Sequence, residues 1–121
     1  METEGRKESD GKLDWSLLPI DALEGTVRVF EKGNIKYGGP RTWLPGIMFS
    51  KLFASVCRHS FDWFFRRLDK DPESGEHPLC HVVANCLMML TYIENDRFDD
   101  RPKRKGRGGY DKETSVRETK A

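Results

Sequence analysis

The stretch from residue 71 to residue 90, DPESGEHPLCHVVANCLMML, combines ligand-type side chains with an apolar run. His77, His81 and Asn85 follow one another at intervals of four, which places them on one stripe of a helix. Two histidines four residues apart can share a metal ion, although the glutamate of an H-E-x-x-H motif is absent here. The alternative is structural, with His77 as a helix cap and His81 as a hydrogen-bonded core histidine.

Acidic side chains precede this helix. Asp69, Asp71 and Glu73 alternate along one short loop and form the kind of oxygen cluster that Mg²⁺ accepts. The same residues also suit ordinary turn and helix-capping chemistry. Glu24 lies two turns from a second glutamate on a predicted helix, about 10 Å along its axis. That spacing suits two metal ions or two sides of a phosphate, whereas the alternative is a solvated face with a Glu24–Arg28 pair.

Cations and aromatic side chains occur in two further places. Lys36, Tyr37 and Trp43 offer a positive charge and two rings around a glycine-rich loop, which suits a nucleobase and its phosphates. Core packing of the two rings is the alternative. Arg58 and His59 offer a phosphate-binding cation and a proton-transfer group, unless their helix simply exposes them to solvent.

Three segments carry apolar side chains at helical spacing, namely 19–37, 47–68 and 78–93. Glycine and proline mark the intervening residues 38–46 and 69–77 as loops. We therefore predict an all-α fold, a small antiparallel domain of three main helices. The third segment has almost no polar face, so we expect it to be the central, buried helix.

The length of 121 residues suits one domain. Residues 1–12 and 99–121 are polar and charged, and we predict that they are disordered. The foldable part, residues 13–98, is small for an independent core. Phe61 and Phe65 widen its apolar surface, so we expect a homo-oligomer, a dimer or a tetramer, to complete the fold.

The net charge of +1 provides no overall field for nucleic acid or a membrane. A basic run at 101–107, RPKRKGR, is the one segment suited to nucleic-acid phosphates. Three cysteines without a C-x-x-C pair or a secretory signal predict reduced thiols in the cytoplasm. No apolar run reaches the roughly 18 residues of a membrane span.

The order and spacing of three sequence blocks resemble a phage-associated family, the dATP/dGTP diphosphohydrolase N-terminal domain. The blocks are DWSLLPIDALEGTVRVFEKGNIKYGGPRTW, RHSFDWFF and DPESGEHPLCHVVANCLMML, which together cover about residues 14–94. They match the family's L-x-P-x-x-A-L-E, K-Y-G, R-H and D-x-E-S-G motifs. Related proteins are similar to MazG-type all-α nucleotide pyrophosphohydrolases.

This resemblance implies hydrolysis of a purine (d)NTP to (d)NMP and pyrophosphate, with Mg²⁺ or Mn²⁺ as cofactor. Carried over residue by residue, it implies metal ligands at Glu24, Asp71 and Glu73, and proton transfer or ligand positioning by His59 and His81. It further implies substrate contacts from Lys36, Tyr37, Trp43 and Arg58. The alternative function is a non-enzymatic helical module that binds nucleotide, nucleic acid or a protein partner.

Overall fold

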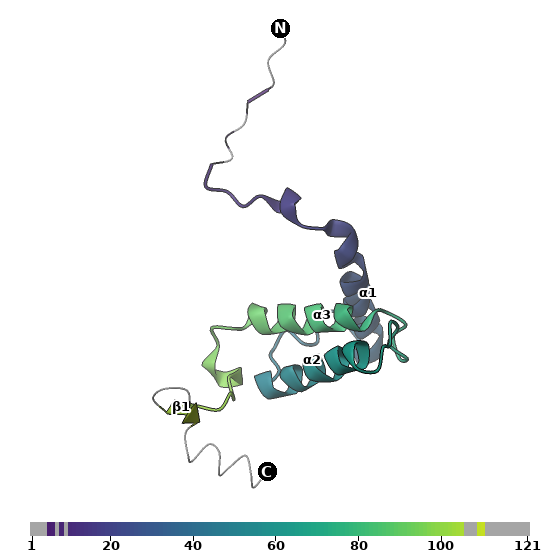
Figure 1. Ribbon diagram of the computed structural model, residues 1–121. Helices are drawn as coiled ribbons and strands as arrows, with labels where there is room; N and C mark the ends of the chain where they lie inside the picture. The colour runs from purple at the N-terminus through teal and green to yellow at the C-terminus, as the bar shows by residue number, and fades with distance from the viewer. Residues whose placement is uncertain (1–4, 7, 9, 106–108, 111–121) are drawn as a thin grey trace.

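The computed structural model describes residues 5–6, 8, 10–105 and 109–110. Its three helices are α1 (Ile20–Tyr37), α2 (Phe49–Phe64) and α3 (Pro78–Thr91) (Figure 1). Two 3₁₀ turns, η1 (Trp15–Leu17) and η2 (Asp96–Phe98), and two antiparallel two-residue strands, β1 (Arg104–Lys105) and β2 (Gly109–Tyr110), complete the described elements. The predicted all-α fold with three main helices is confirmed.

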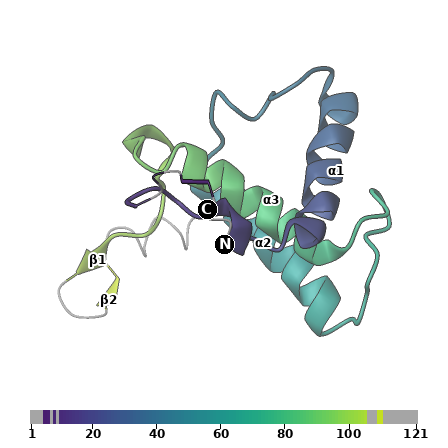
Figure 2. The ribbon, with the colours of Figure 1, turned by 90° about the horizontal axis from the view of Figure 1, so that it is seen from above.

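The third helix is the element that the other two share, because α3 packs against both α2 and α1. α2 and α3 run antiparallel and side by side, and α1 crosses them near the N-terminal end of α3 (Figures 1 and 2). Completion of the domain by further copies stays a prediction.

α1 approaches α3 closely through small side chains. A Cβ added to Gly25 would lie 2.4 Å from the Sγ of Cys80. One residue further on, the buried Thr26 donates its hydroxyl to the carbonyl oxygen of Cys80 over 3.5 Å. This contact brings the following turns of α1 over the loop that precedes α3.

α2 is shorter at both ends than the predicted span of 47–68. No side chain next to its first turn caps it, and Asp100 supplies the cap from far along the chain. The carboxylate of Asp100 accepts hydrogen bonds from the backbone N–H of Ser50 at 2.8 Å and from its hydroxyl at 2.5 Å. At the other end, Arg67 has a left-handed backbone with φ of +58°, which is incompatible with continuing the helix.

The largest buried cluster lies where residues after α3 fold back onto the start of α2. Its members are Phe49, Leu52, Tyr92 and Phe98, with Trp43, Ile47, Met88 and Met89 packed against them. Gly46 is required here, because it has φ of +124° and a Cβ on it would lie 2.0 Å from the Cζ of Phe98.

The predicted segment boundaries, 1–12, 13–98 and 99–121, stay predictions. Residues 1–4, 7, 9, 106–108 and 111–121, which include most of the predicted C-terminal tail, lie outside the described residues. Within the described ones, Asp99 pairs with Arg101 and Asp100 contacts α2 as above.

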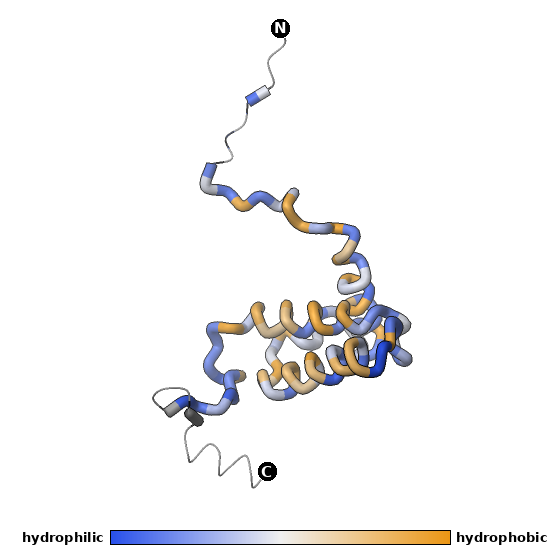
Figure 3. Tube along the Cα trace, viewed as in Figure 1, coloured by the Kyte–Doolittle hydropathy of each residue, from blue (hydrophilic) through white to orange (hydrophobic). Residues whose placement is uncertain are grey.

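The prediction that α3 is buried is only half right. α3 is central, but only Pro78, Ala84 and Asn85 among its residues are buried. The apolar side chains on one side of the helix are exposed to solvent. Hydrophobic residues recur along both α2 and α3 (Figure 3), and several of their large apolar side chains are exposed, among them Phe53, Phe61, Leu87 and Leu90. Within the described part of the chain, no helix has both the length and the hydropathy to cross a membrane.

Candidate functional site

The loop between α2 and α3 closes on itself around Asp71. The backbone N–H of Asp71 donates to the carbonyl of Glu76 at 2.7 Å, and the N–H of Gly75 donates to the carbonyl of Asp71 at 2.8 Å. The carboxylate of Asp71 accepts hydrogen bonds from the N–H of Ser74 at 2.9 Å and from its hydroxyl at 3.0 Å. The D-x-x-S pattern thus folds locally, with the carboxylate serving as the turn's acceptor.

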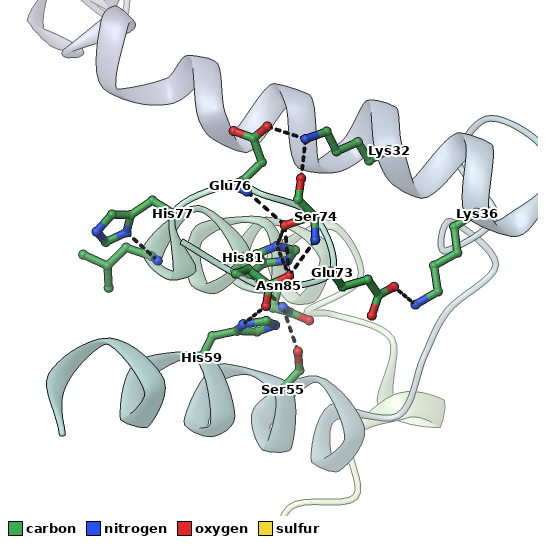
Figure 4. Close-up of polar contacts among 12 residues, drawn as sticks. Lys32, Lys36, Ser55, His59, Glu73, Ser74, Glu76, His77, His81 and Asn85 are labelled. Carbon is green, nitrogen blue, oxygen red and sulfur yellow. Dashed lines mark hydrogen bonds and ion pairs between the residues drawn. The ribbon is translucent and has the colours of Figure 1, made fainter. Parts of the chain in front are cut away.

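Two histidines from different helices stack on each other beside this carboxylate. The rings of His59, on α2, and His81, on α3, lie 4.3 Å apart and within 11° of parallel. The Nδ1 of His59 is 3.7 Å from one oxygen of Asp71, and the Nε2 of His81 is 3.7 Å from the other. The hydroxyl of Ser74 lies 2.6 Å from the Nε2 of His81 (Figure 4). We call His59, Asp71, Ser74 and His81 the histidine cluster.

The hydrogen bonds of Ser74 are consistent with one arrangement of protons in this cluster. If its single hydroxyl proton goes to Asp71, the oxygen accepts from the backbone N–H of Glu76 at 3.2 Å and from the Nε2 of His81. A neutral His81 protonated on Nε2 satisfies every one of these contacts.

The electrostatics agree with this assignment. Burial, followed by the neighbouring His59, lowers the pKa of His81 despite the carboxylate of Asp71. Burial opposes ionisation of Asp71, but the hydrogen bonds from Ser74 and the two imidazoles outweigh it, so the pKa of Asp71 is lowered. At neutral pH the cluster therefore combines an ionised carboxylate with a neutral His81.

One nitrogen of the cluster is unsatisfied. The Nδ1 of His59 is buried and has no hydrogen-bond partner among the described residues, because the 3.7 Å to Asp71 exceeds hydrogen-bond range. Buried polar atoms are nearly always paired, and each exception calls for an explanation, of which a role in chemistry is one. Among the described residues the other such atom is the hydroxyl of Tyr92, in the buried cluster.

Asn85 fixes α3 to α2 beside the histidines. Its buried side-chain amide donates to the carbonyl of His81 at 2.7 Å and to the hydroxyl of Ser55 at 3.2 Å. His81 and Asn85, which the interval of four places on one stripe of α3, therefore both lie toward α2.

Three cationic side chains, spaced one turn apart on α1, form ion pairs with the same loop. Arg28 and Lys32 both bind Glu76, at 2.9 Å and 2.6 Å, and Lys32 also donates to the carbonyl of Ser74. One turn further, Lys36 pairs with Glu73. The hydrogen bond from Lys32, then that from Arg28, lowers the pKa of the buried Glu76.

Sequence analysis missed Glu76 as a member of this site. The signal available was the interval of four that places Arg28, Lys32 and Lys36 on one side of a helix. Which carboxylate they would bind depends on how the loop folds over α1.

His77 lies outside the histidine cluster. Its Nδ1 accepts the N–H of Leu79 at 3.0 Å and caps α3, which was the structural alternative. His81, by contrast, joins His59 in the cluster. The two predicted catalytic histidines are therefore brought together, and their catalytic role stays a prediction.

The predicted substrate residues are dispersed. Lys36 lies over the ring of Tyr37, 5.3 Å from its centroid, and Tyr37 is 63% exposed. Trp43 packs 5.6 Å from Phe30 and against the core, which was the alternative to base stacking. Arg58 is exposed on α2.

The predicted metal ligands do not form a site within one chain. Glu24 is exposed on α1 and adjoins Arg28, Asp71 is committed to Ser74, and Glu73 to Lys36. Among the described residues, no three His, Cys, Asp or Glu side chains lie close enough together to hold a metal ion. The described residues of a single chain therefore do not fit a Mg²⁺ or Mn²⁺ ion, and the role of these three carboxylates stays a prediction.

Comparison with known proteins identifies the family. No curated protein and no solved structure matches the chain. Residues 2–101 match the family described as dATP/dGTP diphosphohydrolase, N-terminal, which includes all three helices and the loop around Asp71. The chain therefore belongs to the dATP/dGTP diphosphohydrolase N-terminal family.

Proposed function

We propose that the chain hydrolyses a purine (d)NTP of the dATP/dGTP type to (d)NMP and pyrophosphate in a cytoplasmic nucleotide pool. The family's description supports the substrate class. The observation that carries the catalytic assignment is the histidine cluster, in which two imidazoles from separate helices stack beside one ionised carboxylate. The buried Nδ1 of His59, which has no hydrogen-bond partner among the described residues, supports a chemical role for the cluster.

The chemistry required is a displacement at phosphorus. A water oxygen attacks the α-phosphorus, the bond from that phosphorus to the α–β bridging oxygen breaks, and pyrophosphate leaves with the bonding electrons. The attacking water must lose a proton, and a neutral imidazole is the side chain suited to accept it near pH 7. His81 is kept neutral by burial, and its contact with Ser74 and Asp71 holds the ring in one orientation.

Cationic residues around the loop bind the negatively charged phosphates of the substrate. Lys36 is exposed and pairs with the exposed Glu73, so an incoming phosphate can replace that carboxylate at little cost. Arg58 supplies a second exposed cation. Tyr37, next to Lys36, is available to stack on the base.

The requirement for Mg²⁺ or Mn²⁺ remains part of the proposal. In proteins such ions stabilise the charge that develops on a transferring phosphoryl group. In the part of one chain that the structure describes, the carboxylates do not gather around a common point.

The direct test is product analysis. We expect the purified chain to convert dATP or dGTP to the monophosphate and pyrophosphate, resolved by chromatography and ³¹P NMR, with Mg²⁺ or Mn²⁺ supplied. dCTP and dTTP serve as matched controls that should turn over more slowly. Release of triphosphate or of single orthophosphates instead would assign the cleavage to another bond.

A second candidate is a non-enzymatic nucleotide-binding module. The observation that favours it is that, among the described residues, no three His, Cys, Asp or Glu side chains lie close enough together to hold the metal ion that the enzyme would need. Saturable dATP or dGTP binding by calorimetry, with no turnover under any metal condition, would support this candidate over the enzyme.

A further inference from the structure

Asn85 is a buried polar side chain between α2 and α3. It is 7% exposed, and its amide donates 2.7 Å to the carbonyl oxygen of His81 and 3.2 Å to the hydroxyl oxygen of Ser55. A carbonyl oxygen can only accept, so the nitrogen of the amide must be the atom that faces His81. This requirement fixes the orientation of the amide and leaves its second proton for Ser55.

The two hydrogen bonds of Asn85 connect both helices. The carbonyl of His81 belongs to α3, one turn before Asn85, whereas Ser55 belongs to α2. Among the described residues, the hydrogen bond from Asn85 to Ser55 is the one direct hydrogen bond between side chains of α2 and α3. This pair is therefore the directional contact that relates the position of one helix to the other.

The pair lies one helical turn from the stacked histidines. Ser55 comes four residues before His59 on α2, and Asn85 comes four residues after His81 on α3. Because the helices are antiparallel, one turn along both leads from the Ser55–Asn85 contact to the His59–His81 contact. The two contacts are adjacent layers of the same interface (Figure 4).

The stacked rings do not select this alignment by themselves. Among the described hydrogen bonds none joins His59 to His81, and two flat rings can stack at a range of offsets. The layer beyond them is another aromatic contact, between Trp63 and His77 at 6.3 Å. By contrast, a buried asparagine that finds its partner at one alignment only is a known means of fixing the register of packed helices.

The geometry around Asp71 requires this alignment. The two oxygens of its carboxylate lie 3.7 Å from the Nδ1 of His59 and from the Nε2 of His81, which belong to different helices. A movement of α2 along α3 would therefore separate one of the two rings from the carboxylate. It would also leave a donor of the buried Asn85 amide without its acceptor, which is unfavourable.

We propose that Asn85 and Ser55 are positioning residues, whose hydrogen bond sets the alignment of α2 and α3 at which His59 and His81 stack beside Asp71. Both act through the two imidazoles and need no contact with a substrate. The catalytic consequence rests on the proposed function, whereas the alignment itself is measurable without a nucleotide.

Nuclear magnetic resonance of the histidine rings tests the alignment. At about pH 8, where an unperturbed imidazole is neutral, we expect a nuclear Overhauser effect between ring protons of His59 and His81 in the wild-type chain. The effect should lose intensity in Ser55→Ala and in Asn85→Leu, each of which removes the hydrogen bond. The matched control Ser60→Ala removes a hydroxyl that forms no hydrogen bond to the described residues, and it should retain the wild-type intensity.

Steady-state kinetics with dATP and dGTP test the catalytic consequence. In Ser55→Ala we expect kcat to fall about 10-fold while KM stays within about two-fold of wild type, because a displaced imidazole impairs proton transfer more than binding. Ser60→Ala should stay within about two-fold of wild type in both constants.

The two measurements separate this inference from the proposed function. A ring contact in Ser55→Ala as strong as in Ser60→Ala would overturn the inference, whatever the activity. A weakened ring contact would support it even in a chain that hydrolyses no nucleotide, and only the proposed reaction would then be refuted. Should Asn85→Leu not fold, as judged by circular dichroism, Ser55→Ala decides alone, since it deletes one hydroxyl from a half-buried side chain.

Discussion

The imidazole rings of His59 and His81 lie 4.3 Å apart and nearly parallel, although the two residues come from antiparallel helices. Asp71, from the loop that joins those helices, faces both rings at 3.7 Å. This relationship ties the closure of the loop to the packing of α2 on α3. Several measurable properties depend on it.

Removing the charge of Asp71 should destabilise the domain. In Asp71→Asn the amide oxygen can still accept from Ser74, but two charge-assisted hydrogen bonds become weaker neutral ones. We expect the free energy of unfolding in urea to fall by about 1.5–3 kcal/mol. The control Asp69→Asn removes an exposed charge from the same loop and should change it by less than about 0.5 kcal/mol. Equal effects of the two substitutions would contradict a special role for Asp71.

Acidification should lower the melting temperature in two stages. His81 has a pKa below its usual value of 6.5 in the folded chain, so the unfolded chain binds its proton first and stability falls as the pH drops below about 6.5. Asp71 has a pKa below 3.8, so its contribution is complete above that value and is lost as the pH falls below it.

Circular dichroism melts between pH 7.5 and pH 3 would resolve the two stages. In His81→Asn the first stage should be reduced and the second retained. His77→Asn should leave both unchanged, because Asn can also cap α3. A His81→Asn profile that coincides with the wild-type profile above pH 5 would rule out the lowered pKa.

Glu76 should control the opening of the loop. It is the buried carboxylate that Arg28 and Lys32 share, and its own carbonyl accepts the N–H of Asp71. In Glu76→Gln we expect the amides of the loop, including that of Asp71, to exchange with deuterium several-fold faster. Glu73→Gln breaks an exposed ion pair only and should leave these rates near wild type. Unchanged exchange in Glu76→Gln would show that the loop closes without the cations of α1.

The capping of α2 by Asp100 should contribute to stability. Asp100→Ala leaves the N–H of Ser50 without its acceptor, and we expect a loss of about 1 kcal/mol in the free energy of unfolding. Glu94→Ala, an exposed carboxylate of the same region, is the control and should be close to neutral. An Asp100→Ala variant as stable as this control would show that the hydrogen bonds of Asp100 do not stabilise α2.

The helices were predictable because their signals are local. Apolar spacing and the flanking glycines and prolines located all three, and His77 with Pro78 marked the start of α3 correctly. The start of α2 was not predictable from local signals, because its cap comes from Asp100, fifty residues away. Its end was not predictable either, because it depends on the left-handed backbone of Arg67.

His59 and His81 were predicted for proton transfer and Asp71 as a metal ligand, and these roles stay predictions. Their arrangement could not be predicted, because the stacking of the two rings depends on how α2 lies on α3. Glu76 was missed because its cations come from α1, across a tertiary contact made by Gly25. The same dependence explains why Glu24, Asp71 and Glu73 do not meet within one chain.

The most direct test of the account is pyrophosphate release from dATP and dGTP by three variants that carry the same substitution, His59→Asn, His81→Asn and His77→Asn. We predict that kcat falls about 100-fold or more in the first two, a loss typical of removing a proton-transfer group, and stays within about two-fold of wild type in the third. Full activity in His59→Asn and His81→Asn, with all three variants folded, would contradict the assignment of the histidine cluster as the catalytic centre.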